Sequence, residues 1–142
     1  MREAKVVTCF LLRRSPAGDE VLLLRRSQQV GTYRGRWAGV SGHLEETTPL
    51  AQAYREIEEE AGLAPDEVSL LRAGEPLVVV DTEAGRRWIV HPFLFEVRRN
   101  AHVRVDWEHT EARWVRPEEV PAFEAVPQLA EALMRVYPPQ LG

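Results

Sequence analysis

Three glutamates near the middle of the chain have the residue type and spacing of a metal-binding group. Glu56, Glu59 and Glu60 stand at positions i, i+3 and i+4 of a segment with helical periodicity, so their side chains are neighbours on one helix face. Like charges at this spacing destabilise a helix by about 0.2–0.5 kcal/mol per pair. Clustered carboxylates are hard ligands suited to Mg²⁺ or Mn²⁺, which can neutralise a pyrophosphate and acidify a bound water. The spacing alone leaves two interpretations open, a divalent-cation site and a solvated acidic helix face.

The residues around these glutamates favour the metal site, because they form a longer pattern. Gly42-His43-Leu44-Glu45 and Thr48-Pro49 are followed by the run Arg55-Glu56-Ile57-Glu58-Glu59-Glu60-Ala61-Gly62-Leu63. This pattern resembles the Nudix box, G-x5-E-x7-R-E-U-x-E-E-x-G-U, in which U is a bulky aliphatic residue. The second half matches at every fixed position, and the resemblance extends over roughly residues 6–120.

The first half of the box is one residue shorter than the family pattern. Counted back from the second half, the family's first glutamate falls on Thr47 and its glycine falls on Ser41. We expect a one-residue deletion in the loop, which lets Gly42 keep the role of the glycine. Either Glu45 or Glu46 would then approximate the missing carboxylate.

The resemblance implies roles for the matching residues. Glu59 and Glu60 are expected to be the main ligands of Mg²⁺, for which Mn²⁺ can substitute. Glu56 is expected to be a further ligand or the base that deprotonates the attacking water. Arg55 is expected to orient Glu56 through a charge-assisted hydrogen bond. The backbone carbonyl of Gly42 is a further candidate ligand, because a glycine lets the backbone approach closely.

Residues outside the second half of the box are expected to contact the substrate or complete the site. Arg26 corresponds to a family position that often contacts substrate phosphate, and Arg36 and His43 are further candidates for substrate binding. A carboxylate from a distant loop often completes such sites. Glu108 is the first candidate for this catalytic role and Glu111 the second, with an exposed loop charge as the alternative for each.

Four other residues have side chains that could act in catalysis or ligand binding, but their neighbours in the sequence favour positions without such a role. Cys9 lies in a strand of buried type with no histidine nearby in sequence, so we expect it in the core. Trp37 and Trp88 are expected in the core as well, with stacking on a nucleotide base as the alternative. His109 is expected at the surface.

The helix that carries the glutamates has clear boundaries. Thr48 is the expected N-cap, Pro49 the first helical residue and Gly62 the C-terminal stop, so the helix is predicted over residues 49–61. Its apolar stripe consists of Leu50, Ala53, Tyr54, Ile57 and Ala61.

The remaining elements predict a mixed sheet around this helix. Strands are predicted at residues 6–12, 21–24, 37–40, 69–73, 76–80, 88–97 and 112–115, and a second helix at residues 127–137. Pro92 indicates an edge position or a bulge in its strand. The expected fold class is α/β, a Nudix fold with a mixed β-sheet sandwiched between α-helices, as a single domain over residues 1–142.

The composition of the chain narrows the classes of partner that it can bind. The chain has 22 acidic against 18 basic residues and a net charge of −4, which argues against an extended nucleic-acid surface. Its apolar runs are far shorter than the ~20 residues of a membrane helix. The single cysteine excludes an internal disulfide and favours a cytoplasmic location.

These observations predict Mg²⁺-dependent hydrolysis of a phosphoanhydride in a nucleoside diphosphate linked to another group, whether a nucleotide, a nucleotide sugar or a dinucleotide. One alternative is a catalytically weak nucleotide-binding sensor, which the shortened loop favours. Another is a diphosphate isomerase, which would need a reactive cysteine at the site, where Cys9 is poorly placed. The individual substrate and the oligomeric state, a homodimer included, stay open.

Overall fold

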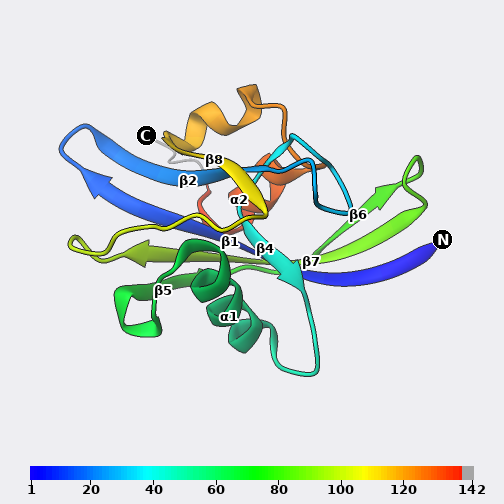
Figure 1. Cartoon of the computed structure of the whole chain (residues 1–142), viewed down its shortest axis with the longest axis horizontal. Coiled ribbons are helices and arrows are strands. Elements are labelled where there is room, and N and C mark those ends of the chain that lie inside the picture. Colours follow the sequence, from blue (N-terminus) through cyan, green and yellow to red (C-terminus); the bar gives the residue numbers. More distant parts are fainter. Residues whose placement is uncertain (139–142) are drawn as a thin grey trace.

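The computed structural model describes residues 1–138, and these form one mixed β-sheet with helices on both faces (Figure 1). The elements in chain order are β1 (Arg2–Ser15), β2 (Gly18–Arg26), β3 (Trp37–Ala38), β4 (Val40–His43), α1 (Pro49–Ala61), the 3₁₀ helix η1 (Pro65–Glu67), β5 (Val68–Ala73), β6 (Leu77–Asp81), β7 (Arg86–Val97), β8 (His109–Val115), the 3₁₀ helix η2 (Pro117–Ala122) and α2 (Leu129–Val136).

Two long parallel strands, β1 and β7, form the centre of the sheet, with Val6 opposite Val90. The other pairings are antiparallel. Strands β2 and β4 pair with β1, β3 and β8 pair with β2, and β5 and β6 pair with β7. The predicted mixed sheet is therefore confirmed.

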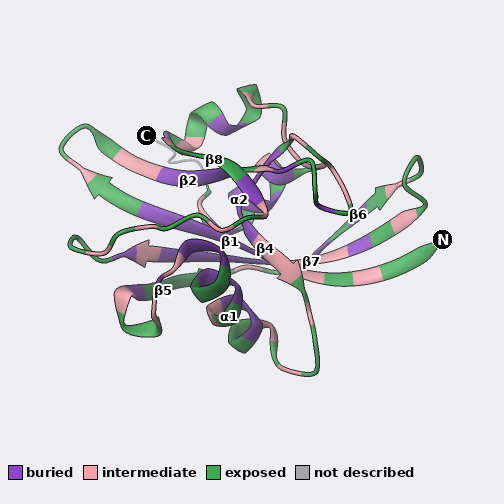
Figure 2. Cartoon of the chain, in the orientation of Figure 1, coloured by how far each residue is buried: buried purple, intermediate pink, exposed green. Residues whose placement is uncertain are grey.

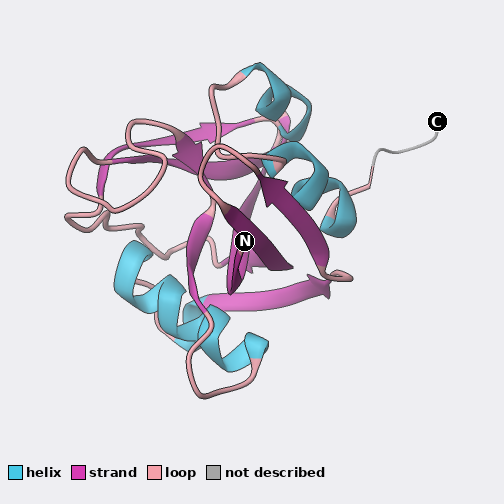
Figure 3. Ribbon diagram, turned by 90° about the vertical axis from the view of Figure 1, so that its right-hand side faces the viewer, coloured by secondary structure: helices cyan, strands magenta, loops and turns pink. Residues whose placement is uncertain are grey.

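The sheet separates two hydrophobic layers, one under α1 and one under α2 (Figure 3). Successive side chains of a strand point to opposite faces. Val7, Cys9 and Leu11 of β1 therefore pack in the layer of α1, whereas Phe10 and Leu12 pack in the layer of α2. The middle of β1 is buried and both of its ends are exposed (Figure 2). The prediction that Cys9 lies in the core is confirmed.

Helix α1 has the predicted boundaries. The Thr48 hydroxyl accepts a hydrogen bond from the Ala51 N–H at 3.2 Å, and Gly62 ends the helix in the left-handed conformation with φ 68°. The stripe facing the sheet is shorter than predicted, because Leu50 is 37% exposed. It lies in the first turn of the helix.

The predicted strand over residues 37–40 is divided into β3 and β4 at Gly39. The two parts pair with different partners, β3 with β2 and β4 with β1. A Cβ atom at Gly39 would lie 2.9 Å from the carbonyl oxygen of Cys9, so a side chain could not pass β1 at this crossing. The split is a consequence of this close approach, which the apolar run in the sequence does not show.

The predicted edge position for Pro92 is wrong, because β7 has partner strands on both sides. Pro92 lies opposite the break between β5 and β6, where the Gly74 N–H donates to the Pro92 carbonyl at 3.0 Å. The nitrogen and the carbonyl of one strand residue point to the same side. The missing N–H therefore faces the break, and the ladder with β1 loses no hydrogen bond.

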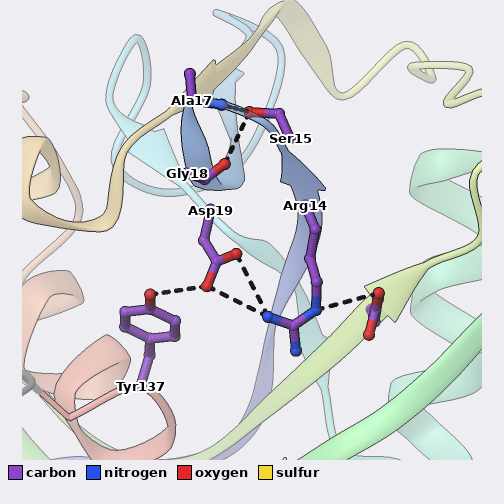
Figure 4. Close-up of polar contacts among 7 residues, drawn as sticks. Arg14, Ser15, Ala17, Gly18, Asp19 and Tyr137 are labelled. Carbon is purple, nitrogen blue, oxygen red and sulfur yellow. Dashed lines mark hydrogen bonds and ion pairs between the residues drawn. The ribbon is translucent and has the colours of Figure 1, made fainter.

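The predicted C-terminal helix is confirmed as α2, with Leu129 and Leu133 buried and Met134 exposed. After it, the Tyr137 hydroxyl donates to Asp19 at 2.9 Å, and Arg14 also contacts Asp19 (Figure 4). This contact ties the tip of the β1–β2 hairpin to the end of α2. Among residues 1–138, no helix combines the length and apolar character needed to cross a membrane.

Candidate functional site

Helix α1 directs two of the three predicted ligands into the protein and leaves the third in solvent. Glu60 is 2% exposed and Glu56 is 8% exposed, and both face strand β4, whereas Glu59 is exposed. Residues four apart lie one above the other on a helix, which places the carboxylates of Glu56 and Glu60 together. The sequence brings the three glutamates to one side of the helix, and packing against β4 decides which of them is buried.

Burial and mutual repulsion act strongly on the Glu56–Glu60 pair. Desolvation raises the pKa of Glu60 to about 10, with further contributions from the charge of Glu56 and from the hydrogen bond between the two carboxyls. Desolvation also raises the pKa of Glu56, and Glu59 and Glu108 add to this effect. Burial and their mutual repulsion therefore both disfavour the ionised form of these two carboxyls.

Three backbone or side-chain groups hold the pair in place. The Gln52 side-chain amide donates to Glu56 Oε1 at 2.9 Å, and the Ser41 N–H donates to Glu60 Oε1 at 3.2 Å. Gly42 passes so close to Glu56 that a Cβ atom there would lie within 2.5 Å of all three carboxylate atoms. A Cβ atom there would push the Glu56 carboxylate aside, so the glycine in β4 is what lets this carboxylate approach the strand so closely.

The shortened loop between β4 and α1 is tied to the helix through Glu45, which bonds both the exposed Arg55 and the buried Gln52. Arg55 Nη1 donates to Glu45 Oε2 at 3.1 Å, and the Glu45 N–H donates to Gln52 Oε1 at 3.2 Å. Glu46 is exposed. The expected hydrogen bond from Arg55 to Glu56 is absent from residues 1–138, where Gln52 is the donor to Glu56. The physical reason is that Arg55 lies on the exposed side of α1, whereas Gln52 lies one turn before Glu56 on its buried side.

The opposite wall of the site comes from the segment that leads into β8. The ring of His109 is 2% exposed, with Nδ1 2.9 Å from Asp106 Oδ1 and Nε2 3.7 Å from Glu60 Oε1. The prediction of a surface position for His109 is therefore wrong. It begins β8 beside Arg26, and this pairing turns its ring inward toward α1.

A pocket of about 170 Å³ lies along the face of the sheet that carries α2, and its lining includes Ser41 and Gly42, the β4 residues that contact Glu60 and Glu56. Glu108, Arg26, His43 and the backbone of β4 line one part of it. Arg26 is held by Thr32, whose carbonyl accepts from Nε at 2.9 Å and whose hydroxyl accepts from Nη2 at 3.3 Å. Burial lowers the pKa of Arg26, which the charges of Glu60 and Glu108 oppose.

The far part of the pocket is apolar and aromatic. Trp88 and Tyr33 line it together with Val and Leu side chains, and the His43 ring lies 5.9 Å from that of Trp88. Trp88 Nε1 donates to the Tyr33 hydroxyl at 3.0 Å. Tyr33 and Gln128 are the non-glycine residues with positive φ in the described chain, and both line this pocket. Backbone strain of this kind gathers at ligand sites.

Arg36 and Glu111, predicted for substrate binding and as a loop carboxylate, lie away from the pocket. Arg36 is exposed, and its Nη1 donates to the Ala125 carbonyl at 3.2 Å. Glu111 is exposed as well and pairs with Arg25 and Arg113, each at 3.7 Å. Of the two candidate loop carboxylates, Glu108 is the one that lines the pocket. Trp37, the other tryptophan considered for stacking, is buried against Phe123.

In a comparison with models of protein families, the NUDIX domain matches residues 2–136 of the chain. This match agrees with the fold and with the geometry of the site. The chain belongs to the Nudix family. It is thus a hydrolase of the class that acts on acid anhydrides, and Nudix hydrolases generally use divalent metal cations. No curated protein sequence matches the chain.

Solved Nudix structures share the whole fold at low sequence identity. An Ap4A hydrolase from C. elegans, solved as a binary complex, is 20% identical with a TM-score of 0.79, and 93% of each chain is covered. The MutT protein from Methanosarcina mazei Go1 is 25% identical with a TM-score of 0.69, covering 95% of this chain and 94% of that one. The NUDIX domain of NrtR from Shewanella oneidensis, complexed with ADP ribose, is 13% identical with a TM-score of 0.74, covering 95% and 86%.

The donor chemistry of the Nudix box fits a divalent cation. Within residues 1–138, no three His, Cys, Asp or Glu side chains are arranged to hold a metal ion together. Two buried carboxylates nevertheless face each other with raised pKa values, and a cation is the partner that relieves their repulsion. Oxygen donors of this type suit hard divalent cations better than softer metals.

Sequence reasoning missed several residues of this site, among them Gln52, Asp106, His109 and Gln128. Gln52 stands four residues before Glu56, so helical spacing was a signal that could have found it. Asp106 and His109 lie in a segment without periodicity, and Gln128 precedes a helix without a capping pattern. For these three residues the sequence holds no local signal.

Proposed function

We propose that the protein hydrolyses a phosphoanhydride bond in a nucleoside diphosphate joined to another group, in a reaction that depends on Mg²⁺, with Mn²⁺ as a substitute. The observation that carries this proposal is the buried Glu56–Glu60 pair packed against β4, whose residues Ser41 and Gly42 line a pocket with a charged end and an aromatic end. The charged end suits a diphosphate and the aromatic end suits a nucleoside. The lone buried thiol of Cys9 is consistent with a cytoplasmic location.

Glu56, Glu60, the exposed Glu59 and the Gly42 carbonyl are the residues that would hold the cation. When bound, the cation would neutralise the diphosphate and acidify a water for attack on phosphorus. Gln52 and the Ser41 N–H keep the two buried carboxylates in one orientation. This fixed orientation lowers the reorganisation that the reaction needs.

Arg26 and Glu108 line the same pocket and would have different roles, phosphate binding for Arg26 and proton transfer for Glu108. The Arg26 guanidinium, braced by Thr32, presents its free N–H groups to a phosphate. Glu108 lines the same pocket as the β4 residues and is the candidate to accept a proton from the attacking water. Trp88 and Tyr33 would pack against a base, and the Gln128 carboxamide can hydrogen-bond its edge.

A binding module is the second candidate, and one observation favours it. Glu45 of the shortened loop is engaged by Arg55, and Glu46 is exposed, so neither carboxylate of this loop reaches the buried pair. A site with fewer donors would bind a nucleotide and cleave it slowly. The similarity to a NUDIX domain complexed with ADP ribose is consistent with either function.

Product analysis separates the two candidates. Purified protein is incubated with nucleoside triphosphates, dinucleoside polyphosphates, ADP-ribose and nucleotide sugars, with and without Mg²⁺. Cleavage of one class that needs Mg²⁺ and is lost in Glu59→Gln and Glu60→Gln supports the hydrolase. Glu58→Gln is the matched control, because Glu58 is an exposed glutamate on the same helix. Tight binding of one compound without any cleavage would refute the hydrolase and support the binding module.

A further inference from the structure

The hydroxyl of Tyr33 lies in the middle of a chain of hydrogen bonds that leads out of the pocket. It accepts from Trp88 Nε1 at 3.0 Å and donates to Asp81 Oδ2 at 2.5 Å. An indole N–H can only donate, so the single proton of the tyrosine hydroxyl is directed to the carboxylate. Tyr33 and Trp88 line the aromatic part of the pocket, whereas Asp81 is not part of the lining.

Asp81 is the last residue of β6, and the alternation of this strand explains its position. Leu77, Val79 and Asp81 share one face of the strand, because successive side chains point to opposite faces. Leu77 and Val79 line the pocket, and Val79 is paired with Trp88 of β7. Asp81 continues this row, and its Oδ1 accepts from the Ala84 N–H at 3.2 Å in the turn before β7. The carboxylate is therefore held by its own hairpin.

Tyr33 belongs to the segment of residues 27–36, between β2 and β3, and its backbone needs support. Its φ of 48° lies in the left-handed region, which a residue with a side chain adopts only where its surroundings hold it. The ends of the segment are held by backbone bonds, from the Gly35 N–H to the Arg26 carbonyl at 2.9 Å and from the Arg26 N–H to the Arg36 carbonyl at 2.8 Å. Loss of the bond to β6 would therefore free the Tyr33 ring and leave Arg26 in place.

We propose that Asp81 is a positioning residue, which holds the Tyr33 ring in place for the nucleoside part of the substrate without touching the substrate itself. This role rests on the proposed function, in which Tyr33 and Trp88 pack against a base. A side chain that is already ordered spares the cost of ordering it during binding, which corresponds to roughly 2–10-fold in Kd. The effect is confined to ligands that carry a base, because the arginine end of the pocket does not depend on this bond.

Titration of the full chain with AMP, GMP, CMP and UMP in the presence of Mg²⁺, followed by the NMR signals of backbone and indole N–H groups, tests this role. Monophosphates contain no anhydride, so nothing is cleaved during the measurement. Asp81→Ala should weaken binding of the monophosphate that the wild type binds best by roughly 3–10-fold and leave the Kd of inorganic phosphate unchanged. The Trp88 indole signal of the free protein should shift as well, because its acceptor has moved.

A double-mutant cycle with Tyr33→Phe shows whether Asp81 acts through the tyrosine hydroxyl. Tyr33→Phe keeps the ring but removes its anchor, so it should weaken the same monophosphate by a similar factor. In this background Asp81→Ala should have no further effect, since the bond is already lost. If Asp81→Ala alone does not fold, an unchanged monophosphate affinity in Tyr33→Phe is sufficient to overturn the role.

Two variants of the same hairpin control for charge and for the turn. Glu83→Ala removes an exposed carboxylate from the turn, and Gly85→Ala strains the turn at a φ of 64°; both should bind like the wild type. An Asp81→Ala protein with wild-type affinity for the monophosphate, or with an equal loss of affinity for inorganic phosphate, would overturn the positioning role and leave the proposed function intact. A wild type that binds none of the four monophosphates would instead refute the proposed function.

Discussion

Replacing Gly42 with alanine tests whether the closeness of β4 to α1 is what sets the site. The added Cβ atom would lie within 2.5 Å of the three atoms of the Glu56 carboxylate. Unbonded carbon atoms prefer a separation of about 3.5–4.0 Å, so the carboxylate must move by about 1 Å or more. The glycine has no positive φ, so the backbone itself accepts an alanine.

The displacement has two measurable consequences. Glu56 would lose the hydrogen bond from Gln52, which lowers the free energy of unfolding by about 1–2 kcal/mol. For a domain of this size this corresponds to a fall in Tm of roughly 3–8 °C. A misplacement of about 1 Å in a catalytic group lowers kcat by roughly 100-fold.

The assay combines steady-state kinetics on a cleaved substrate with thermal unfolding. Gly31→Ala is the matched control, because a Cβ atom there meets no other atom within 4 Å, and it should behave like the wild type. In a Glu56→Ala background, the stability loss from Gly42→Ala should disappear, since the clash has been removed. A Gly42→Ala protein with wild-type kcat and Tm would refute the reasoning, as would an unchanged loss in the Glu56→Ala background.

Three further predictions follow from the same geometry. In the presence of a chelator, the free energy of unfolding should fall as the pH rises from 6 to 8. Burial raises the pKa of Glu60 in the folded protein to about 10, above its value in the unfolded chain, so a rising pH deprotonates the unfolded chain first and favours it. The loss is at most about 1.4 kcal/mol per pH unit. Denaturation curves at several pH values should show a smaller slope for Glu60→Gln, and an identical slope would contradict this. Tyr33→Phe should lower the free energy of unfolding in urea by about 1 kcal/mol, because the Trp88 N–H loses its acceptor, and an unchanged midpoint would show that this bond contributes nothing. Glu108→Gln should lower kcat by roughly 100-fold, whereas Glu111→Gln, whose salt bridges are exposed, should leave it unchanged; equal kcat values would remove Glu108 from the mechanism.

The helix that carries the box could be predicted almost to the residue, because its signals are local. The Thr48 cap, Pro49 at the first position and Gly62 in the left-handed conformation each act within one turn of the backbone. The alternation along β1 likewise assigns its side chains to two faces without reference to any partner strand. The sheet order could not be predicted in this way, since β1 and β7 pair across about 80 residues of intervening chain.

The position of Pro92 shows why a local rule can mislead. The rule that proline avoids central strands rests on the loss of one N–H donor. In this fold the nitrogen faces the break between β5 and β6, where no ladder hydrogen bond is missing. The physics of the rule holds, but its consequence depends on which segment lies opposite.

The sequence by itself determined the family, the glutamate helix and the chemistry those glutamates favour, because residue type and helical spacing are sufficient for each. Only the tertiary structure decided that Glu56 and Glu60 are buried while Glu59 is exposed, and that Glu108 rather than Glu111 lines the pocket. It also brought His109, expected at the surface, behind Glu60. Burial and proximity depend on which strands and loops pack against a residue from elsewhere in the chain, and that information is not contained in the spacing of its neighbours.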